Sequence, residues 1–227
     1  MSQVDEAQAS RAAVLGLSVV GLVFLVSGFF RRELYAYNAP LYWGFDLFKF
    51  VVVPVAVALF LAKRYRIQPK HYGLRGVADG ETWLQFIGLA LFLVLILDLV
   101  YYASWYIGWL IFRPENVTAF YREINPDGLL RIPVTLYMAV TAGIVEEVFF
   151  RGLPLHLLER QFPNQVPRRA YVLGTAAAFG LIHWPNGTHE VLATFVFGLL
   201  AASIYLRLRD LWPLIVAHAL IDLYGFA

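Results

Sequence analysis

Long apolar stretches follow one another along the chain, separated by short polar segments. They show no alternation of period two, so they predict helices and not the strands of a barrel. A helix needs about 20 apolar residues to cross roughly 30 Å of hydrocarbon. The candidate stretches are Ala12–Phe30, Phe45–Ala62, Trp83–Phe112, Ile132–Glu159, Ala170–Trp184, Val191–Leu206 and Leu211–Phe226. The pattern therefore predicts an all-α, polytopic membrane bundle of about seven transmembrane helices.

Composition agrees with a protein whose main partner is the lipid bilayer. The 227 residues are 60% hydrophobic and 15% charged, whereas soluble domains average about 25% charged. No repeat or long linker divides the chain, so residues 1–227 are expected to form a single transmembrane domain. The net charge of +2 suggests no nucleic-acid partner. Because cysteine is absent, disulfides, thiolate metal sites and a cysteine nucleophile are excluded.

The distribution of lysine and arginine predicts how the chain is oriented, because cytoplasmic loops carry an excess of both. Most of them follow the second, fourth and sixth stretches: Lys63, Arg64, Arg66, Lys70 and Arg75, then Arg160, Arg168 and Arg169, then Arg207 and Arg209. The opposite loops hold fewer: Arg31 and Arg32, then Arg113, Arg122 and Arg131. The N-terminus is therefore expected to be cytoplasmic. The location is expected to be a bacterial inner membrane, which the charges by themselves do not show. The first stretch is expected to be retained, since it lacks a basic n-region and a cleavage site.

Ionisable residues inside the apolar stretches are the candidates for function, because charge at membrane depth is costly. They are Glu146, Glu147 and Arg151 in the fourth stretch, His183 in the fifth, and His218 and Asp222 in the seventh. Counted at about 1.5 Å per residue from the cytoplasmic ends, Glu146, His183, His218 and Asp222 lie roughly 12–21 Å deep. We expect these four side chains to meet in one layer near the midplane.

The spacing within each helix divides the glutamate pair. Glu147 and Arg151 are four residues apart, acidic before basic, and are interpreted as a structural ion pair. Glu146 lies about 100° round the helix from Glu147, so the two carboxylates are expected to face different groups. Glu146 then has no partner of its own, which suits a carboxylate that acts on water. His218 and Asp222, also four apart, share one helix face.

These residue types fit the hydrolysis of an amide. A carboxylate and a histidine around a water, here Glu146 and His183, can deprotonate it for attack on a carbonyl and later protonate the leaving amine. His218 and Asp222 fit an oxyanion site, where Asp222 either orients a protonated His218 or donates in its own neutral form. Zinc held by the same four residues is the alternative, although no His-Glu-x-x-His motif is present. No Gly-x-Ser-x-Gly motif supports a serine peptidase.

Three motifs follow in order: Glu146-Glu147-x-x-x-Arg151, Phe179-x-x-x-His183 and His218-x-x-x-Asp222. Together they resemble the motifs of the CAAX-protease and bacteriocin-processing (CPBP, or Abi) family, over roughly residues 132–224. The resemblance implies a helical catalytic core whose site opens inside the bilayer, and a peptidase acting on membrane-embedded or lipidated proteins. It implies catalysis by Glu146, His183, His218 and Asp222, with Glu147, Arg151 and Phe179 in support. No cofactor is expected, with a zinc ion as the alternative.

A non-enzymatic protein on the same scaffold is the rival hypothesis, as an immunity factor, a chaperone or a proton-coupled transporter. A transporter would more often show broken helices or an inverted repeat, and the sequence has neither. Asp98 lies outside the motifs and is expected to pair with a polar group on a neighbouring helix. His71 and His189 are expected to be solvated in loops, and Pro185-Asn186-Gly187 predicts a turn.

Overall fold

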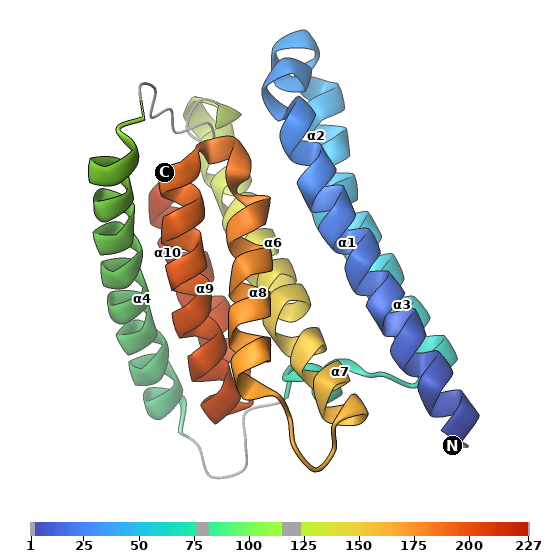
Figure 1. Ribbon diagram of the computed structural model, residues 1–227. Coiled ribbons are helices and arrows are strands. Elements are labelled where there is room, and N and C mark those ends of the chain that lie inside the picture. The colour runs from blue at the N-terminus through green and yellow to red at the C-terminus, as the bar shows by residue number, and fades with distance from the viewer. Residues whose placement is uncertain (1–2, 76–81, 115–123, 227) are drawn as a thin grey trace.

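The computed structural model describes residues 3–75, 82–114 and 124–226, and this part of the chain is all helical (Figure 1). Two of the long helices contain a π-helical turn, η1 or η4. The helices are α1 (Gln3–Tyr37), α2 (Ala39–Leu47), η1 (Phe48–Val52), α3 (Val53–Tyr65), α4 (Trp83–Phe112), α6 (Arg131–Glu147), η4 (Val148–Gly152), α7 (Leu153–Gln161), α8 (Arg168–Ile182), α9 (Thr188–Leu208) and α10 (Trp212–Phe226). Since α2, η1 and α3 are continuous, as are α6, η4 and α7, these elements form seven helical segments. Each predicted apolar stretch corresponds to one of them, so the all-α prediction is confirmed.

Five of the described segments are long and apolar enough to cross a membrane. They are Gln8–Tyr37, Ala39–Tyr65, Trp83–Phe112, Gly128–Gln161 and Thr188–Leu208. Large apolar side chains such as Leu15, Leu22, Leu95 and Leu99 are more than half exposed on these helices. Exposed apolar surface on this scale is typical of helices that face lipid. The chain is an integral membrane protein.

The segments form a bundle in which α9 packs against α8 and α4, while α10 packs against α6 and α4 (Figure 1). α1 and α3 lie along one side of this bundle, and α1 contacts α7 and α8. The two termini lie at opposite ends of the bundle in Figure 1.

Glycines let the helices that carry the candidate residues approach one another closely. A Cβ on Gly143 of α6 would lie 3.0 Å from the carbonyl oxygen of Ile215 on α10. A Cβ on Gly198 of α9 would lie 3.0 Å from Cα of Ala176 on α8. Small residues at such crossings are characteristic of membrane helices, where packing replaces the hydrophobic driving force. The side chains one turn beyond Gly143, at Glu146 and Glu147, therefore reach α10.

Both π-helical turns are followed by a proline, Pro54 after η1 and Pro154 after η4. A proline inside a helix lacks an N–H group, and its ring clashes with the carbonyl four residues earlier. A wider turn just before the proline accommodates this ring without ending the helix. η4 begins directly after Glu147 and contains Arg151. π-helical turns of this kind occur frequently at functional sites.

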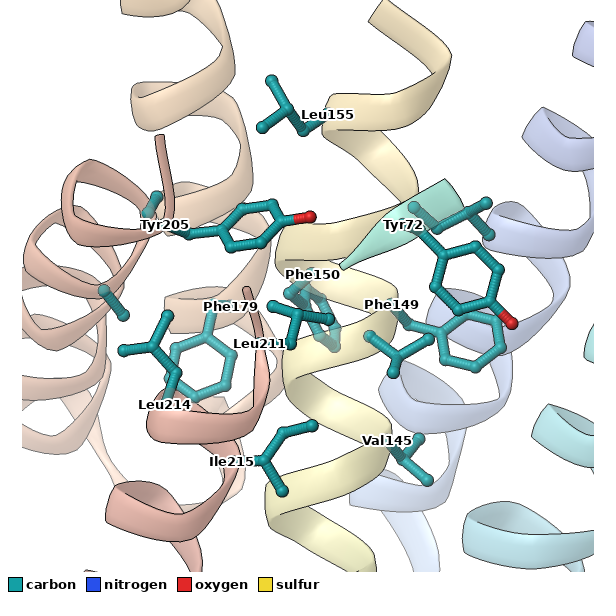
Figure 2. Packing of buried hydrophobic residues seen from close by; sticks show 14 of the residues in the cluster. Tyr72, Val145, Phe149, Phe150, Leu155, Phe179, Tyr205, Leu211, Leu214 and Ile215 are labelled. Carbon is teal, nitrogen blue, oxygen red and sulfur yellow. The ribbon is translucent and has the colours of Figure 1, made fainter. Parts of the chain in front are cut away.

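A core of aromatic and aliphatic side chains supports η4 (Figure 2). Phe150 lies against Phe179 of α8, with ring centroids 5.6 Å apart, and both are buried. Tyr205 of α9 and Tyr72, from the short 3-10 helix Pro69–Tyr72, are also buried in this cluster. This packing fixes the turn that carries Arg151.

Several loop predictions are wrong, because hydropathy ends a stretch before the helix itself ends. Arg31 and Arg32 lie on α1, which continues to Tyr37. His189 lies in the first turn of α9 and is only 2% exposed, so it is not solvated. The turn at Pro185-Asn186-Gly187 is confirmed by the 3-10 helix Trp184–Asn186 and the positive φ of Gly187. His71 is exposed, as predicted.

Candidate active site

A cavity of about 350 Å³ lies between the helices, and four candidate side chains line it together. They are Glu146 of α6, His183 directly after α8, and His218 and Asp222 of α10. The predicted convergence of these residues from three helices is therefore confirmed. Glu146 and His218 are 6% and 5% exposed, so the cavity is set well inside the bundle.

His218 lies between three carboxylates. Its Nδ1 is 2.8 Å from Oε1 of Glu147, and its Nε2 is 3.8 Å from Glu146 and 3.6 Å from Asp222. The expectation that the two glutamates face different groups is wrong. An imidazole carries nitrogens on two edges, so consecutive residues of α6 can contact one ring from different sides. Glu147 accepts the one hydrogen bond of normal length from His218, so Asp222, at 3.6 Å, is not the main group that orients the ring.

The predicted ion pair between Glu147 and Arg151 is present, with Oε1 and Nη1 3.2 Å apart and both side chains almost fully buried. The guanidinium of Arg151 lies 4.0 Å from the centre of the Phe179 ring, a cation–π contact. The hydroxyl of Tyr171 donates a hydrogen bond to the Arg151 carbonyl at 3.1 Å. Arg151, Glu147 and His218 therefore form one buried polar chain behind the cavity.

His183 is fixed by the end of its own helix. Its Nδ1 lies 2.8 Å from the carbonyl oxygen of Phe179, and its ring centre is 4.8 Å from that of Phe179. A carbonyl only accepts hydrogen bonds, so Nδ1 carries the proton and Nε2 of the neutral ring has a free lone pair. Phe179 thus positions His183 through its backbone carbonyl and its ring, as expected of a residue that supports His183.

Glu146 and His183 also line a second, smaller pocket of about 30 Å³. Arg31 of α1, Lys49 of η1 and Asn186 contribute to the same pocket. This volume exceeds the roughly 10–15 Å³ that a cavity needs to hold a water molecule. The pocket is polar, with both donors and acceptors in its wall, so it suits a water that contacts Glu146 and His183 together.

Residues 128–224 match a family model described as Rce1-like, type II CAAX prenyl endopeptidase. The chain carries a domain of this family. The resemblance carried by the three motifs is confirmed for this segment, which runs from η3 (Gly128–Leu130) through most of α10. No curated protein and no solved structure matches the chain. The family is one of peptidases, and its description implies prenylated or otherwise lipidated protein substrates.

The cavity extends beyond the Rce1-like domain, onto residues that the sequence analysis did not single out. Tyr42, Asp46 and Phe50 come from α2 and η1, and Tyr101 and Trp105 come from α4. Asp46 pairs with Lys49 at 3.3 Å and accepts a hydrogen bond from the Tyr137 hydroxyl at 3.1 Å. Asp46 and Lys49 are opposite charges three positions apart inside an apolar stretch. The same kind of pattern predicted the pair of Glu147 and Arg151.

Glu190 of α9 is another cavity residue that the sequence motifs do not mark. It lines the cavity and accepts a hydrogen bond from the Tyr101 hydroxyl at 2.7 Å. The hydropathy pattern had placed it in the loop before Val191, and nothing in the motifs marks it. Only the packing of α4 against α9 shows that it reaches the same cavity as His183.

Asp98 of α4 does not line this cavity. No hydrogen bond or ion pair joins it to another residue of the described ranges, so its predicted polar partner is not found there. Within the part of the chain that the structure describes, no group of three or more His, Cys, Asp or Glu side chains is arranged to hold a metal ion.

Proposed function

We propose that the chain is an intramembrane endopeptidase that hydrolyses a peptide bond in a membrane-embedded or lipidated protein. Glu146 and His183 activate the water, and His218 and Asp222 form the oxyanion site. The observation that carries this proposal is the meeting of these four side chains in one cavity of an Rce1-like domain. Buried acids and imidazoles in a concave pocket are the usual setting of general acid–base catalysis.

Water activation follows from the positions of Glu146 and His183 around the small pocket that they share. The carboxylate of Glu146 takes a proton as the water oxygen attacks the scissile carbonyl carbon. Nε2 of His183 accepts a hydrogen bond from the second O–H of the water, which keeps its proton, because Nδ1 is committed to the Phe179 carbonyl. This contact orients the water oxygen towards the scissile carbonyl. The proton held by Glu146 then passes to the leaving amine when the carbon–nitrogen bond breaks.

Stabilisation of the tetrahedral intermediate falls to His218. Glu147 accepts from Nδ1, which leaves Nε2 on the side of Glu146 and Asp222. In its protonated form, His218 donates from Nε2 to the developing oxyanion. Asp222 supports that form through its charge. Arg151 holds Glu147 in place, so the buried chain behind the cavity sets the direction of the His218 ring.

The membrane setting completes the proposal. Five helices are long enough to span the bilayer, and we infer that the 15-residue helices α8 and α10 also cross it, for seven crossings in all. The excess of lysine and arginine in alternate loops supports a cytoplasmic N-terminus, and we propose a bacterial inner membrane as the location. A cavity with aromatic walls, among them Phe50, Phe179 and Phe197, suits a peptide segment that is extended within the bilayer or carries a lipid.

The test is cleavage of a fluorogenic prenylated peptide by the purified protein and by the variants Glu146→Gln and His183→Ala. We expect kcat to fall by about 10²–10⁴-fold in each, the usual contribution of a general acid or base. Asp98→Asn is the matched control, since this acid lies on α4 outside the cavity, and we expect it to keep the wild-type rate. If both catalytic variants remain folded and fully active, the proposed mechanism is wrong.

The rival hypotheses give different outcomes in the same assay. A zinc-dependent version of the site requires that exhaustive chelation abolish cleavage, and we expect cleavage to survive it. A non-enzymatic immunity factor or a proton-coupled transporter would cleave no peptide. For either of these proteins, the cellular phenotype would not depend on peptide hydrolysis by Glu146.

A further inference from the structure

Glu190 stands in the wall of the cavity but has no part in the proposed water activation. Its carboxylate accepts a hydrogen bond from the Tyr101 hydroxyl at 2.7 Å and another from the indole of Trp105. Both donors are neutral, and both lie on α4, outside the residues that match the family model. The arrangement therefore belongs to this chain and not to the shared catalytic motifs.

Among the described residues, no lysine or arginine lines the cavity or forms an ion pair with Glu190. The charge of Arg31 reaches Glu190 from the smaller neighbouring pocket, where Arg31 donates a hydrogen bond to Asn186. Asp46, another acid of the wall, is already compensated by Lys49. The hydrogen bonds of Glu190 come from neutral donors only, and a carboxylate forms stronger ones with a cationic donor that contacts it directly.

A second observation at the same place also indicates a ligand that donates hydrogen bonds. His189 precedes Glu190, lines the cavity and is 2% exposed. Its Nδ1 has no hydrogen-bond partner among the described residues. The His189 ring lies edge-on to Trp105, with centroids 5.3 Å apart. An imidazole acceptor, a carboxylate and aromatic faces are together the surroundings that an organic cation prefers.

We propose that Glu190, Tyr101, Trp105 and His189 form a subsite for a cationic side chain of the substrate, a lysine or an arginine close to the scissile bond. This inference rests on the proposed function only in that the cavity receives the substrate. Glu190 also lies in the first turn of α9, where the positive end of the helix dipole stabilises a carboxylate. A purely structural Glu190 would not distinguish one substrate from another.

The experiment measures binding of peptides that differ at a single position. Prenylated peptides with lysine or norleucine are compared at each of the residues flanking the scissile bond. The full chain is used in detergent, with Glu146→Gln in every variant so that no peptide is cleaved. We expect lysine to improve the Kd by about tenfold or more at one position, as a charge-assisted hydrogen bond in a dry site does. In Glu190→Gln this ratio should fall to within about twofold.

Asp98→Asn removes the same charge from α4 outside the cavity, and it should keep the tenfold ratio. If Glu190→Gln fails to fold, Trp105→Leu tests the same subsite, because it removes the indole donor and the aromatic face. The proposal is overturned if lysine and norleucine bind equally at every position, or if the ratio survives in the folded variants. If the ratio behaves as expected but the wild-type chain cleaves none of the peptides, the subsite stands and the peptidase proposal fails.

Discussion

His218 illustrates how one side chain depends on the buried groups behind it. Its Nδ1 is bonded to Glu147, and Glu147 in turn is held by Arg151 at 3.2 Å. Arg151 is 1% exposed and Glu147 is fully buried. Removing one member of a buried ion pair leaves an uncompensated charge, and this costs far more than losing a pair at the surface.

Glu147→Gln is therefore predicted to destabilise the protein by about 3–5 kcal/mol, because Arg151 loses its counter-charge in a dry site. Glu159→Gln is the matched control. Glu159 pairs with Arg209, but both side chains are about a third exposed, so the loss should stay within about 1 kcal/mol. Denaturant unfolding in detergent, followed by tryptophan fluorescence, measures both. Equal effects of the two substitutions would show that the buried chain is not a stabilising unit.

The sequence was sufficient to predict some of these contacts and not others. The four-residue spacing predicted the pair of Glu147 and Arg151, because helix geometry alone brings such residues together. The bond between Glu147 and His218 joins residues 71 positions apart. It depends on how closely α6 and α10 approach, which periodicity within one helix does not encode. For the same reason, Glu190 was missed.

At the scale of an element, η4 is the segment whose packing is most constrained. A Cβ on Gly152 would lie 2.2 Å from the carbonyl oxygen of Tyr72 and 2.8 Å from Cδ1 of Leu211. Tyr72 and Leu211 both belong to the cluster around this turn (Figure 2). The absence of a side chain at position 152 therefore allows the 3-10 helix Pro69–Tyr72 to lie directly on η4.

Gly152→Ala is predicted to destabilise the protein by about 1–3 kcal/mol, because a backbone carbonyl must move to admit the methyl group. The control is Gly174→Ala on α8, where a Cβ would meet nothing within 4 Å. That substitution should be neutral or slightly stabilising, since alanine favours a helix over glycine. Thermal unfolding in detergent compares them. A Gly152→Ala protein as stable as wild type would mean that Tyr72 does not rest on η4 in solution.

Hydropathy predicted every helix but not the local features that matter most for the site. The π turns accommodate Pro54 and Pro154, and hydropathy does not report this change of helix geometry. The start of α9 was also missed, because His189 and Glu190 are polar although both face the interior of the bundle. Hydropathy ranks these residues as loop-like, whereas the structure buries them against α4.

At the scale of the whole molecule, the wall of the cavity comes from two parts of the chain. The Rce1-like domain, residues 128–224, supplies Glu146, His183, His218 and Asp222. α2, η1 and α4 supply much of the remaining wall of the cavity. The three sequence motifs predicted these four residues of the Rce1-like domain. The second part has no motif, because a wall can be built from many aromatic and apolar residues.

The topology of the chain gives the last prediction, and the absence of cysteine makes it direct to test. Lys70, after α3, and Leu129, before α6, are both exposed, and α4 is the long apolar span between them. Lys70→Cys should react with a membrane-impermeant thiol reagent only from the cytoplasmic side, and Leu129→Cys only from the outside. The reverse pattern would mean that the orientation is inverted. Labelling of both cysteines from the same side would show that α4 does not cross the membrane. The expected result would place Glu190, near the start of α9, towards the external end of the cavity.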